Sequence, residues 1–268
     1  MRRRDFIVRS GMAASAAMVF PGIAHARKNK QKQYIELRIY HFDSPEKRGT
    51  YESFLESAAI PAWNRAGVRP VGAFRLLMND NPDLKLTSDS TDLFIVLPHS
   101  SADSFVQLPS RLAADRAFQQ AGEAILTAPK SDAAFTRYES SLMIAFDDFP
   151  QVTVPTTALG RLVQLRIYES HNEERAGKKI QMFNQGGELT IFSRSRMTGV
   201  FFGQTLIGSK LPSLTYMLSF PSEQEQKKAW DTFRSDPEWK RLSKADEYKD
   251  AVSNVTNLIL RPIQGSQI

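Results

Sequence analysis

The sequence predicts an α+β protein that contains two copies of one β-α-β-β-α-β unit. The strand motif at residues 36–40 returns at residues 164–168, 128 positions later, and Phe54 corresponds to Phe183 at a spacing of 129. The order of predicted strands and helices is also the same in the two copies. Self-similarity over so long a period is typical of a duplicated supersecondary unit. Further corresponding pairs are Trp63/Phe192, Arg65/Arg194, Val71/Val200, Asp115/Asp236 and Phe118/Trp239.

Each copy opens with a strand whose side chains alternate between apolar and polar. In residues 34–40 the isoleucine and leucine side chains share one face, and the glutamate, arginine and tyrosine share the other. Residues 163–168 repeat the pattern and place Arg166 and Tyr168 on the polar face. We expect the apolar face to pack against helices and the arginine and tyrosine face to point into the space between two sheets.

A helix is predicted after each opening strand. In the first copy Ser44 is the expected N-cap and Pro45 follows it, where the missing N–H costs nothing. In the second copy residues 170–173, Ser-His-Asn-Glu, fit a capping box with Ser170 as the N-cap. The glycines at 186–187 then end the helix.

Two strands, a helical region and a last strand complete each copy. In the first copy they are expected at residues 70–77, 92–97, 101–126 and 136–146, and in the second at residues 200–207, 214–220, 222–252 and 254–261. This order is the ferredoxin-like split βαβ arrangement. Helices then cover one face of each sheet, and the other faces pack together across a pseudo-twofold axis or close into a barrel.

The N-terminal residues are typical of an export signal. Residues 3–7, Arg-Arg-Asp-Phe-Ile, fit a twin-arginine motif, and a weakly apolar stretch leads to the small-residue site at 24–26. We therefore expect a twin-arginine signal peptide at residues 1–26, a basic linker at 27–32 and a periplasmic location. An uncleaved N-terminal membrane anchor is the alternative, although the stretch is short for a spanning helix.

Charge and composition exclude several classes of function. The net charge of +6 includes four arginines and one aspartate of the signal, and the remaining 31 basic and 28 acidic residues are dispersed. This balance argues against a nucleic-acid partner. The chain has no cysteine, no histidine pair with metal-ligating spacing and no phosphate-binding glycine motif. We therefore expect no metal and no cofactor.

The chain resembles the NIPSNAP family. The motifs that carry the resemblance lie mainly in the second copy, at residues 165–173 (LRIYESHNE), 179–184 (KIQMFN), 187–188 (GE), 200–203 (VFFG) and 230–239 (WDTFRSDPEW). The first copy keeps the strand motif but has Phe-Asp-Ser at 42–44, where the second copy has Ser-His-Asn. Any function that depends on this segment is therefore expected in the second copy alone.

The resemblance implies two tandem domains with the ferredoxin-like fold of dimeric α/β-barrel proteins, packed here as an intrachain pseudo-dimer. The implied boundaries are domain 1 at 33–148, a linker at 149–159, domain 2 at 160–263 and a tail at 264–268. The family implies no established reaction or cofactor. Relatives in fold include cofactor-independent monooxygenases, haem-degrading enzymes and isomerases that use the cleft between sheet and helices, but a shared fold does not carry function.

Arg166 is the first candidate for a ligand site. An arginine on a strand covered on both faces needs a partner for its charge. Glu36 supplies a carboxylate two residues before Arg38, whereas Gln164 stands at that place in the second copy. We therefore expect Arg166 to bind a ligand anion. The alternative is an internal ion-pair network that fixes how the two domains dock.

The other candidate residues lie close to Arg166 in the sequence or in the same copy. Tyr168 and Asn172 are expected to orient the ligand, and Phe202 and Trp230 to form apolar walls, although aromatic residues at helical spacing are also typical of a core. His171 is the candidate general base, because it stands at a strand-to-helix junction that favours anions. Alternatively, this segment is only a helix cap.

These observations lead to three hypotheses for function. The first is binding of a small anionic or amphipathic organic ligand in the cleft of domain 2. The second is a cofactor-independent enzyme, of the monooxygenase or isomerase type, that uses His171. The third is a protein-interaction module with an exposed apolar patch. The expected partners are a small molecule or a second copy of the chain as a homo-oligomer, with no nucleic acid and no stable membrane insertion after signal removal.

Overall fold

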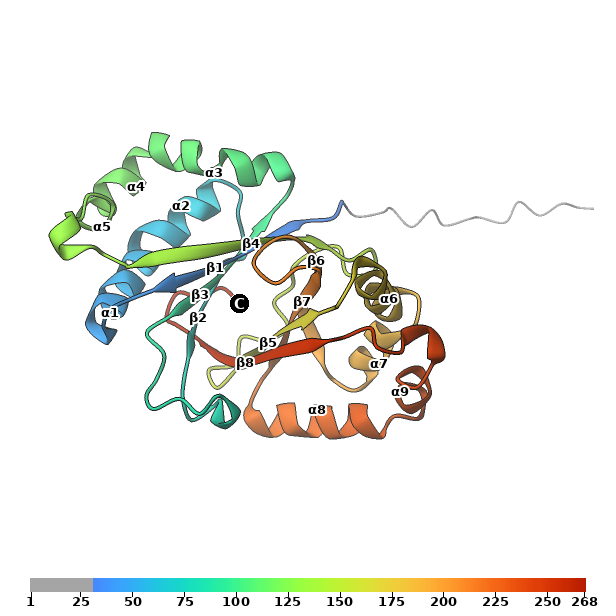
Figure 1. The fold of residues 1–268 in the computed structure, drawn as a ribbon. Coiled ribbons are helices and arrows are strands. Elements are labelled where there is room, and N and C mark those ends of the chain that lie inside the picture. The colour runs from blue at the N-terminus through green and yellow to red at the C-terminus, as the bar shows by residue number, and fades with distance from the viewer. Residues whose placement is uncertain (1–30) are drawn as a thin grey trace, which may run out of the picture.

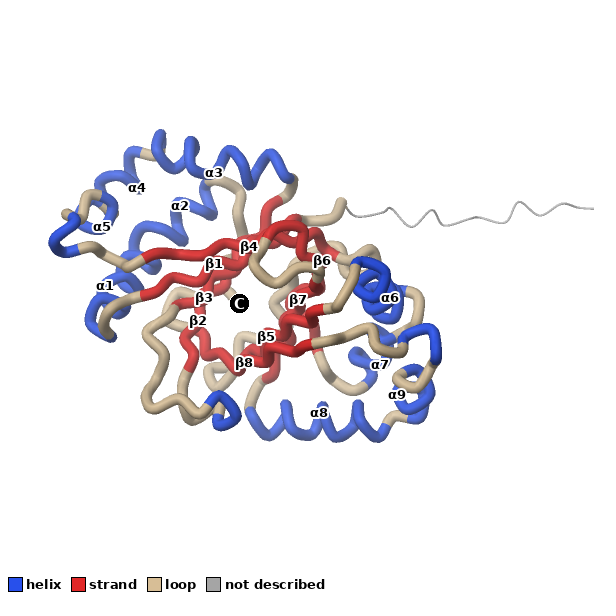
Figure 2. Tube along the Cα trace, in the orientation of Figure 1, coloured by secondary structure: helices blue, strands red, loops and turns tan. Residues whose placement is uncertain are grey.

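Eight antiparallel strands close into a barrel in the computed structural model, which describes residues 31–268. The predicted signal peptide and most of the basic linker lie outside the described residues. Helices α1–α5 cover one side of the barrel and helices α6–α9 cover the opposite side (Figure 1, Figure 2). Among the described helices, none is long and apolar enough to cross a membrane.

The first half of the chain forms strands β1–β4. Its elements are β1 (Tyr34–His41), α1 (Pro45–Phe54), a π-helical turn (Leu55–Ala59), α2 (Ile60–Arg65), β2 (Gly72–Leu76), β3 (Leu93–His99), α3 (Ala102–Ala114), α4 (Arg116–Ala121), α5 (Glu123–Leu126) and β4 (Arg137–Ala145). The second half repeats this order with β5 (Leu162–Glu169), α6 (Glu173–Asn184), α7 (Glu188–Arg194), β6 (Thr198–Ile207), β7 (Ser213–Phe220), α8 (Glu223–Ser235), α9 (Pro237–Leu242) and β8 (Asn254–Pro262). The predicted β-α-β-β-α-β order is therefore confirmed in both halves.

The strands follow the order β1-β3-β2-β8-β5-β7-β6-β4 around the barrel. Each half contributes four neighbouring strands, and two seams join the halves. At one seam β2 pairs with β8, where Leu76 lies opposite Leu260, and at the other β4 pairs with β6, where Ala145 lies opposite Gly203. Closure pairs the edge strands of each half, which would otherwise be open to association.

The barrel interior is apolar, and this corrects the predicted direction of the strand faces. One buried cluster contains side chains from all eight strands, which can meet only inside the barrel: Ile35, Leu37, Phe74, Leu76, Phe94, Val96, Met143, Ala145, Val163, Leu165, Val200, Phe201, Met217 and Leu260. The apolar face of β1 and β5 therefore points inward, and the face with Arg38 and Arg166 lies under the helices. The prediction that this polar face points between the sheets was wrong, because a small closed barrel has room only for tightly packed side chains.

The helices pack on the outer face of the barrel through two further clusters. In the first half α1, the π-helical turn and α2 contribute Tyr51, Leu55 and Trp63, which meet Ile95 of β3. In the second half Phe183, Phe192 and Phe233 form one cluster with Tyr216 of β7. The ring centroids of Phe183 and Tyr216 are 5.4 Å apart, and those of Phe192 and Phe233 are 4.8 Å apart. These apolar contacts fix the height of the helices above the sheet.

The helix starts are partly as predicted. Ser44 caps α1 by accepting a hydrogen bond from the backbone N–H of Lys47, and Pro45 is the first helical residue, which confirms the expectation. In α6, however, the N-cap is Asn172, whose Oδ1 accepts from the Arg175 N–H at 2.9 Å. The predicted capping box at Ser170 was wrong. Ser170 directly follows β5, where its N–H donates to a turn carbonyl beside β7 and its hydroxyl donates to the Ala251 carbonyl at 2.7 Å.

Candidate functional site

Each half has a cavity between its sheet and its helices. The first cavity, about 480 Å³, includes Arg38, Tyr40, Tyr51, Ala59 and Trp63 in its lining. The second cavity is larger, about 740 Å³, and its lining includes Gln164, Arg166, Tyr168, Glu188, Phe192, Trp230, Phe233 and Trp239. A loop of the first half, residues 80–84, completes the second cavity at its open edge. The two sites therefore occupy corresponding places but differ in the side chains that they contain.

The arginine of the first cavity is fully paired. Arg38 donates from Nε to Glu36 Oε1 at 2.6 Å and from Nη2 to Oε2 at 3.1 Å. Glu36 also accepts from the Ser140 hydroxyl at 2.7 Å and lies 3.2 Å from His99 Nε2. Burial opposes ionisation of Glu36, but the hydrogen bonds with these groups and the charge of Arg38 lower its pKa from 4.5 to about 2. The expected Glu36–Arg38 pairing is confirmed, and it leaves no free cation in this place.

Gln164 stands in the second half where Glu36 stands in the first, and it forms hydrogen bonds with other residues. Its Oε1 accepts from Trp230 Nε1 at 2.7 Å and from Gln226 Nε2 at 3.1 Å, and its Nε2 donates to Asn257 Oδ1 at 2.6 Å. None of these hydrogen bonds involves Arg166. The amide therefore fixes Trp230 in the cavity wall without neutralising the neighbouring arginine.

The side chain of Arg166 makes no hydrogen bond or ion pair with any residue in the described range 31–268, and its buried Nε has no partner. Its guanidinium carbon lies 4.9 Å from the ring centroid of Trp230 and 5.2 Å from that of Tyr168. Contact with aromatic faces orients a guanidinium and stabilises it modestly, but it brings no carboxylate into contact with the positive charge. The second cavity thus presents a half-buried cation to whatever occupies it.

A buried ion pair and a pair of phenols lie in the same region. Lys179 Nζ of α6 donates to Glu188 Oε2 of α7 at 2.7 Å, and both side chains are buried. Burial raises the pKa of Glu188, and Lys179 opposes this effect. The hydroxyls of Tyr168 and Tyr216 are 2.9 Å apart, and burial raises the pKa of each phenol. Two cations, Arg166 and Lys179, thus lie near one carboxylate, Glu188.

Three of the six predicted site residues come together. Arg166, Tyr168 and Trp230 all line the second cavity. Phe202 does not, because it is buried in the outer core, where its ring stacks on Tyr216 with centroids 5.4 Å apart. Phe202 instead lines a different cavity, between residues 147–155 and α7.

His171 and Asn172 lie apart from this cavity. Both are exposed at the start of α6, and neither belongs to the linings of the two cavities. Asn172 acts as the N-cap of the helix. Because His171 is exposed and lines neither cavity, the segment does not assemble the acid–base site that its residue types suggested.

The sequence reasoning missed Lys179, Glu188, Gln226 and Asn257. The pairing of Lys179 with Glu188 depends on how α6 packs beside α7, which periodicity within one helix cannot show. The internal repeat carried a usable signal, since Glu188 corresponds to Ala59 at the spacing of 129. A charge gained in one copy at an otherwise apolar position marks a candidate functional residue.

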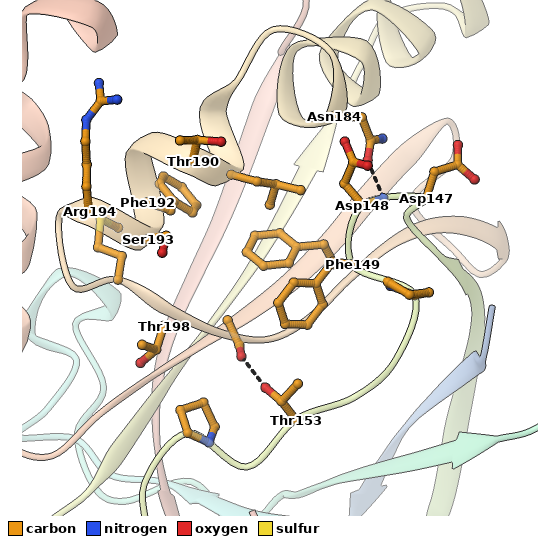
Figure 3. Close-up of a pocket in the computed structure, with 16 residues that line it drawn as sticks. Asp147, Asp148, Phe149, Thr153, Asn184, Thr190, Phe192, Ser193, Arg194 and Thr198 are labelled. Carbon is orange, nitrogen blue, oxygen red and sulfur yellow. Dashed lines mark hydrogen bonds between the residues drawn. The ribbon is translucent and has the colours of Figure 1, made fainter. Parts of the chain in front are cut away.

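A third cavity, about 1040 Å³, is larger than these two but is less suited to binding chemistry (Figure 3). It is a groove between residues 147–155 and α7, lined by the rings of Phe149 and Phe192. Its arginine, Arg194, is paired with Asp236 and Glu238, each at 2.7 Å. Thr153 holds the segment on β6 by donating to the Gly199 carbonyl at 2.6 Å. Size alone therefore does not identify the site.

No cluster of three or more metal-ligating side chains occurs in residues 31–268.

Comparison with known proteins identifies the second half most clearly. Residues 163–267 match the profile of the NIPSNAP family. No curated protein matches the sequence. Because the matched segment contains Gln164, Arg166, Lys179, Glu188 and Trp230, the chemistry of the second cavity lies within it.

Solved structures with the same fold cover nearly the whole chain. A candidate monooxygenase from Fusobacterium nucleatum subsp. nucleatum has a TM-score of 0.57 at 10% identity, covering 87% of this chain and 93% of that chain. A candidate monooxygenase from Lactobacillus acidophilus has a TM-score of 0.55 at 12% identity, covering 87% and 94%. At such identities the similarity shows the fold alone. The chain is thus a mixed α/β protein built on a closed eight-stranded antiparallel barrel, and its residues 163–267 match the model of the NIPSNAP family.

Proposed function

We propose that the protein binds a small, anionic and amphipathic organic molecule in the second cavity. The observation that supports this most directly is the contrast between two arginines at corresponding positions. Arg38 is neutralised by Glu36, whereas Arg166 faces the second cavity with no carboxylate partner among the described residues. A half-buried guanidinium binds a carboxylate, sulfonate or phosphate through charge-assisted and often bidentate hydrogen bonds.

The remainder of the cavity supports an amphipathic ligand over a simple inorganic ion. Trp230, Trp239, Phe192 and Phe233 supply apolar and aromatic surface around Arg166. A volume of about 740 Å³ lies in the range of sites for small organic molecules. The charge of Arg166 favours one negative charge on the ligand, and the partly desolvated surroundings strengthen that attraction relative to bulk water.

A pair of fluorescent probes tests the proposal. Anilinonaphthalenesulfonate (ANS) is an amphipathic anion, and N-phenylnaphthylamine is the same ring system without the sulfonate. We expect Gln164→Glu to place a carboxylate beside Arg166, as Glu36 lies beside Arg38, and to weaken ANS binding by at least about tenfold. Binding of the neutral probe is expected to change less than about twofold.

Two details make this experiment specific. Glutamate keeps acceptor oxygens for Trp230 and Gln226. It loses the N–H donor to Asn257 Oδ1, but the Asn257 amide can turn over and donate its own N–H to the new carboxylate. Gln120→Glu on the exposed surface of α4 adds the same charge away from the cavity and serves as the matched control. If the Gln164→Glu and Gln120→Glu proteins bind ANS equally well, Arg166 does not hold the anion and the proposal fails.

Residues 1–26 continue to predict export, and we propose that the ligand is met in the periplasm. Binding in the second cavity does not depend on this location, because every residue named for it belongs to the described barrel and its helices.

A further inference from the structure

The second cavity contains a buried carboxylate that anion binding does not use. Glu188 lines the cavity and is 1% exposed. Its Oε2 accepts from Lys179 Nζ at 2.7 Å, and its Oε1 makes no hydrogen bond with any residue of the described chain. One oxygen is therefore held in place by the lysine, while the other is left for a group inside the cavity.

The duplicated fold shows that this position does not require a charge. The spacings of 128 and 129 place Tyr51 and Ala59 in the first half where Lys179 and Glu188 stand in the second. Tyr51 and Ala59 also line the first cavity, so the same space is filled there without an ion pair. Replacing a buried ion pair by apolar groups is often neutral or stabilising. Packing therefore gives no reason for the charged pair in the second half.

We infer that Glu188 is a proton-accepting catalytic residue, and that the molecule bound beside Arg166 is a small organic carbon acid. This inference rests on the proposed function, and it adds a reaction to the binding. In the step, Glu188 Oε1 takes a proton from a carbon next to a carbonyl group. The electron pair of the broken C–H bond moves to the carbonyl oxygen, and the enolate charge is stabilised by Arg166. Return of the proton to a different atom completes an isomerisation.

The surroundings of Glu188 suit this role. Lys179 of α6 positions the carboxylate, and Arg166 of β5 lies close enough to affect its ionisation. Burial raises the pKa of Glu188, and a carboxylate with a raised pKa is a stronger base near neutral pH. Other titratable groups that face the cavity are Tyr168 of β5, Lys227 and Arg234 of α8, and Asp80 and Asp83 of the loop from the first half, with Tyr216 of β7 bonded to Tyr168.

A general carbon acid tests the inference without knowledge of the natural substrate. Nitrobenzisoxazole loses its ring C–H proton to a carboxylate, its N–O bond breaks, and the coloured product cyanonitrophenolate carries the electron pair as a negative charge. The protonated carboxylate then returns its proton to water. We expect the wild-type protein to catalyse this elimination at least about a hundredfold faster than Glu188→Gln. The rate should rise with pH around a midpoint above the usual range of a carboxyl group, and saturating ANS should suppress it.

A double variant and a matched control separate loss of activity from loss of folding. Glu188→Gln leaves Lys179 buried without its partner, which is destabilising. The double variant Lys179→Met/Glu188→Gln removes both charges at similar volume and is expected to unfold at nearly the wild-type temperature while remaining inactive. Glu174→Gln, on the exposed surface of α6, is the matched control and should retain the full rate.

The outcomes separate this inference from the proposed function. If ANS binding depends on Gln164 as expected, but elimination proceeds equally fast in wild type and in the folded double variant, Glu188 is not the base. An elimination rate in the wild-type protein no greater than that of acetate buffer overturns the inference in the same way. If instead ANS binding is indifferent to Gln164→Glu, the anion site itself is wrong.

Discussion

Glu36 and Gln164 differ by one oxygen and one nitrogen, and this difference decides what each neighbouring arginine can do. The carboxylate at Glu36 commits Arg38 to an internal ion pair at 2.6 Å. The amide at Gln164 is instead shared by Trp230, Gln226 and Asn257. The same strand position is therefore structural in one half and available for binding in the other.

Glu36 should make stability depend on pH. Burial opposes its ionisation, but hydrogen bonds with His99, Arg38 and Ser140 lower its pKa to about 2 in the folded protein. A carboxyl whose pKa is lower in the folded than in the unfolded state stabilises the fold above the unfolded pKa, and this stabilisation is lost as pH falls through the folded pKa. The shift corresponds to about 3 kcal/mol, which should be lost between about pH 4.5 and pH 2.

Urea unfolding of the wild type and Glu36→Gln across this range measures the effect. The difference in free energy of unfolding should be largest near neutral pH and should shrink as the medium becomes more acidic. A difference that stays constant with pH would show that Glu36 is not ionised in the folded protein.

At the residue scale the sequence was informative where the two copies could be compared. The Glu36/Gln164 contrast was visible in the sequence and led to Arg166, which the fold brings together with Tyr168 and Trp230. His171 was chosen for its chemical type, yet its exposed place at a helix start separates it from the cavity. Chemical type alone does not show which side of a strand-to-helix junction a side chain occupies.

At the scale of elements, one ion pair in each half attaches a short helix to its neighbours, α4 in the first half and α9 in the second. Arg65 of α2 binds Asp115, the N-cap of α4, at 2.8 Å, and Arg194 of α7 binds Asp236, the N-cap of α9, at 2.7 Å. Exposed pairs of this kind contribute little free energy. Their position is nevertheless specific, because each aspartate both starts a helix and attaches it to the preceding helix pair. In the second half this arrangement brings Trp239 of α9 to the cavity wall.

Replacement of the N-cap of α6 should separate helix stability from binding. Asn172→Ala removes the side-chain acceptor for the Arg175 N–H and should lower the free energy of unfolding by about 1 kcal/mol. ANS affinity should stay unchanged, because Asn172 is exposed and does not line the second cavity. Chemical unfolding and ANS titration of the same preparation measure both quantities. A loss of affinity at unchanged stability would return Asn172 to the ligand site.

At the scale of the whole molecule, the element order was predictable and the direction of the strand faces was not. Alternation along β1 shows that Ile35 and Leu37 share a face, but it does not show whether that face meets helices or the barrel interior. Both sides of the strand are covered, so burial alone does not decide between them. The answer depends on closure of the barrel through β2–β8 and β4–β6, which are contacts between the two halves.

The loop at residues 80–84 also joins the halves. Asn81 exchanges hydrogen bonds of 2.8 Å with the backbone of Ile259, and Asp80 binds Arg261 at 2.7 Å. This loop lies between β2 and β3, yet it lines the second cavity. The second cavity therefore takes one wall from outside the segment that matches the NIPSNAP profile.

The symmetry of the seams predicts how the second half behaves alone. In the repeat β2 corresponds to β6 and β4 corresponds to β8, so both seams join the same two kinds of strand. A fragment of residues 160–268 should therefore form a homodimer, in which β8 of each copy pairs with β6 of the other and the barrel closes again. Such a dimer lacks the loop at 80–84 and should bind ANS several-fold more weakly than the full chain. Light scattering after size-exclusion chromatography measures the assembly, and a folded monomer would show that the outer strands of each half do not need a partner.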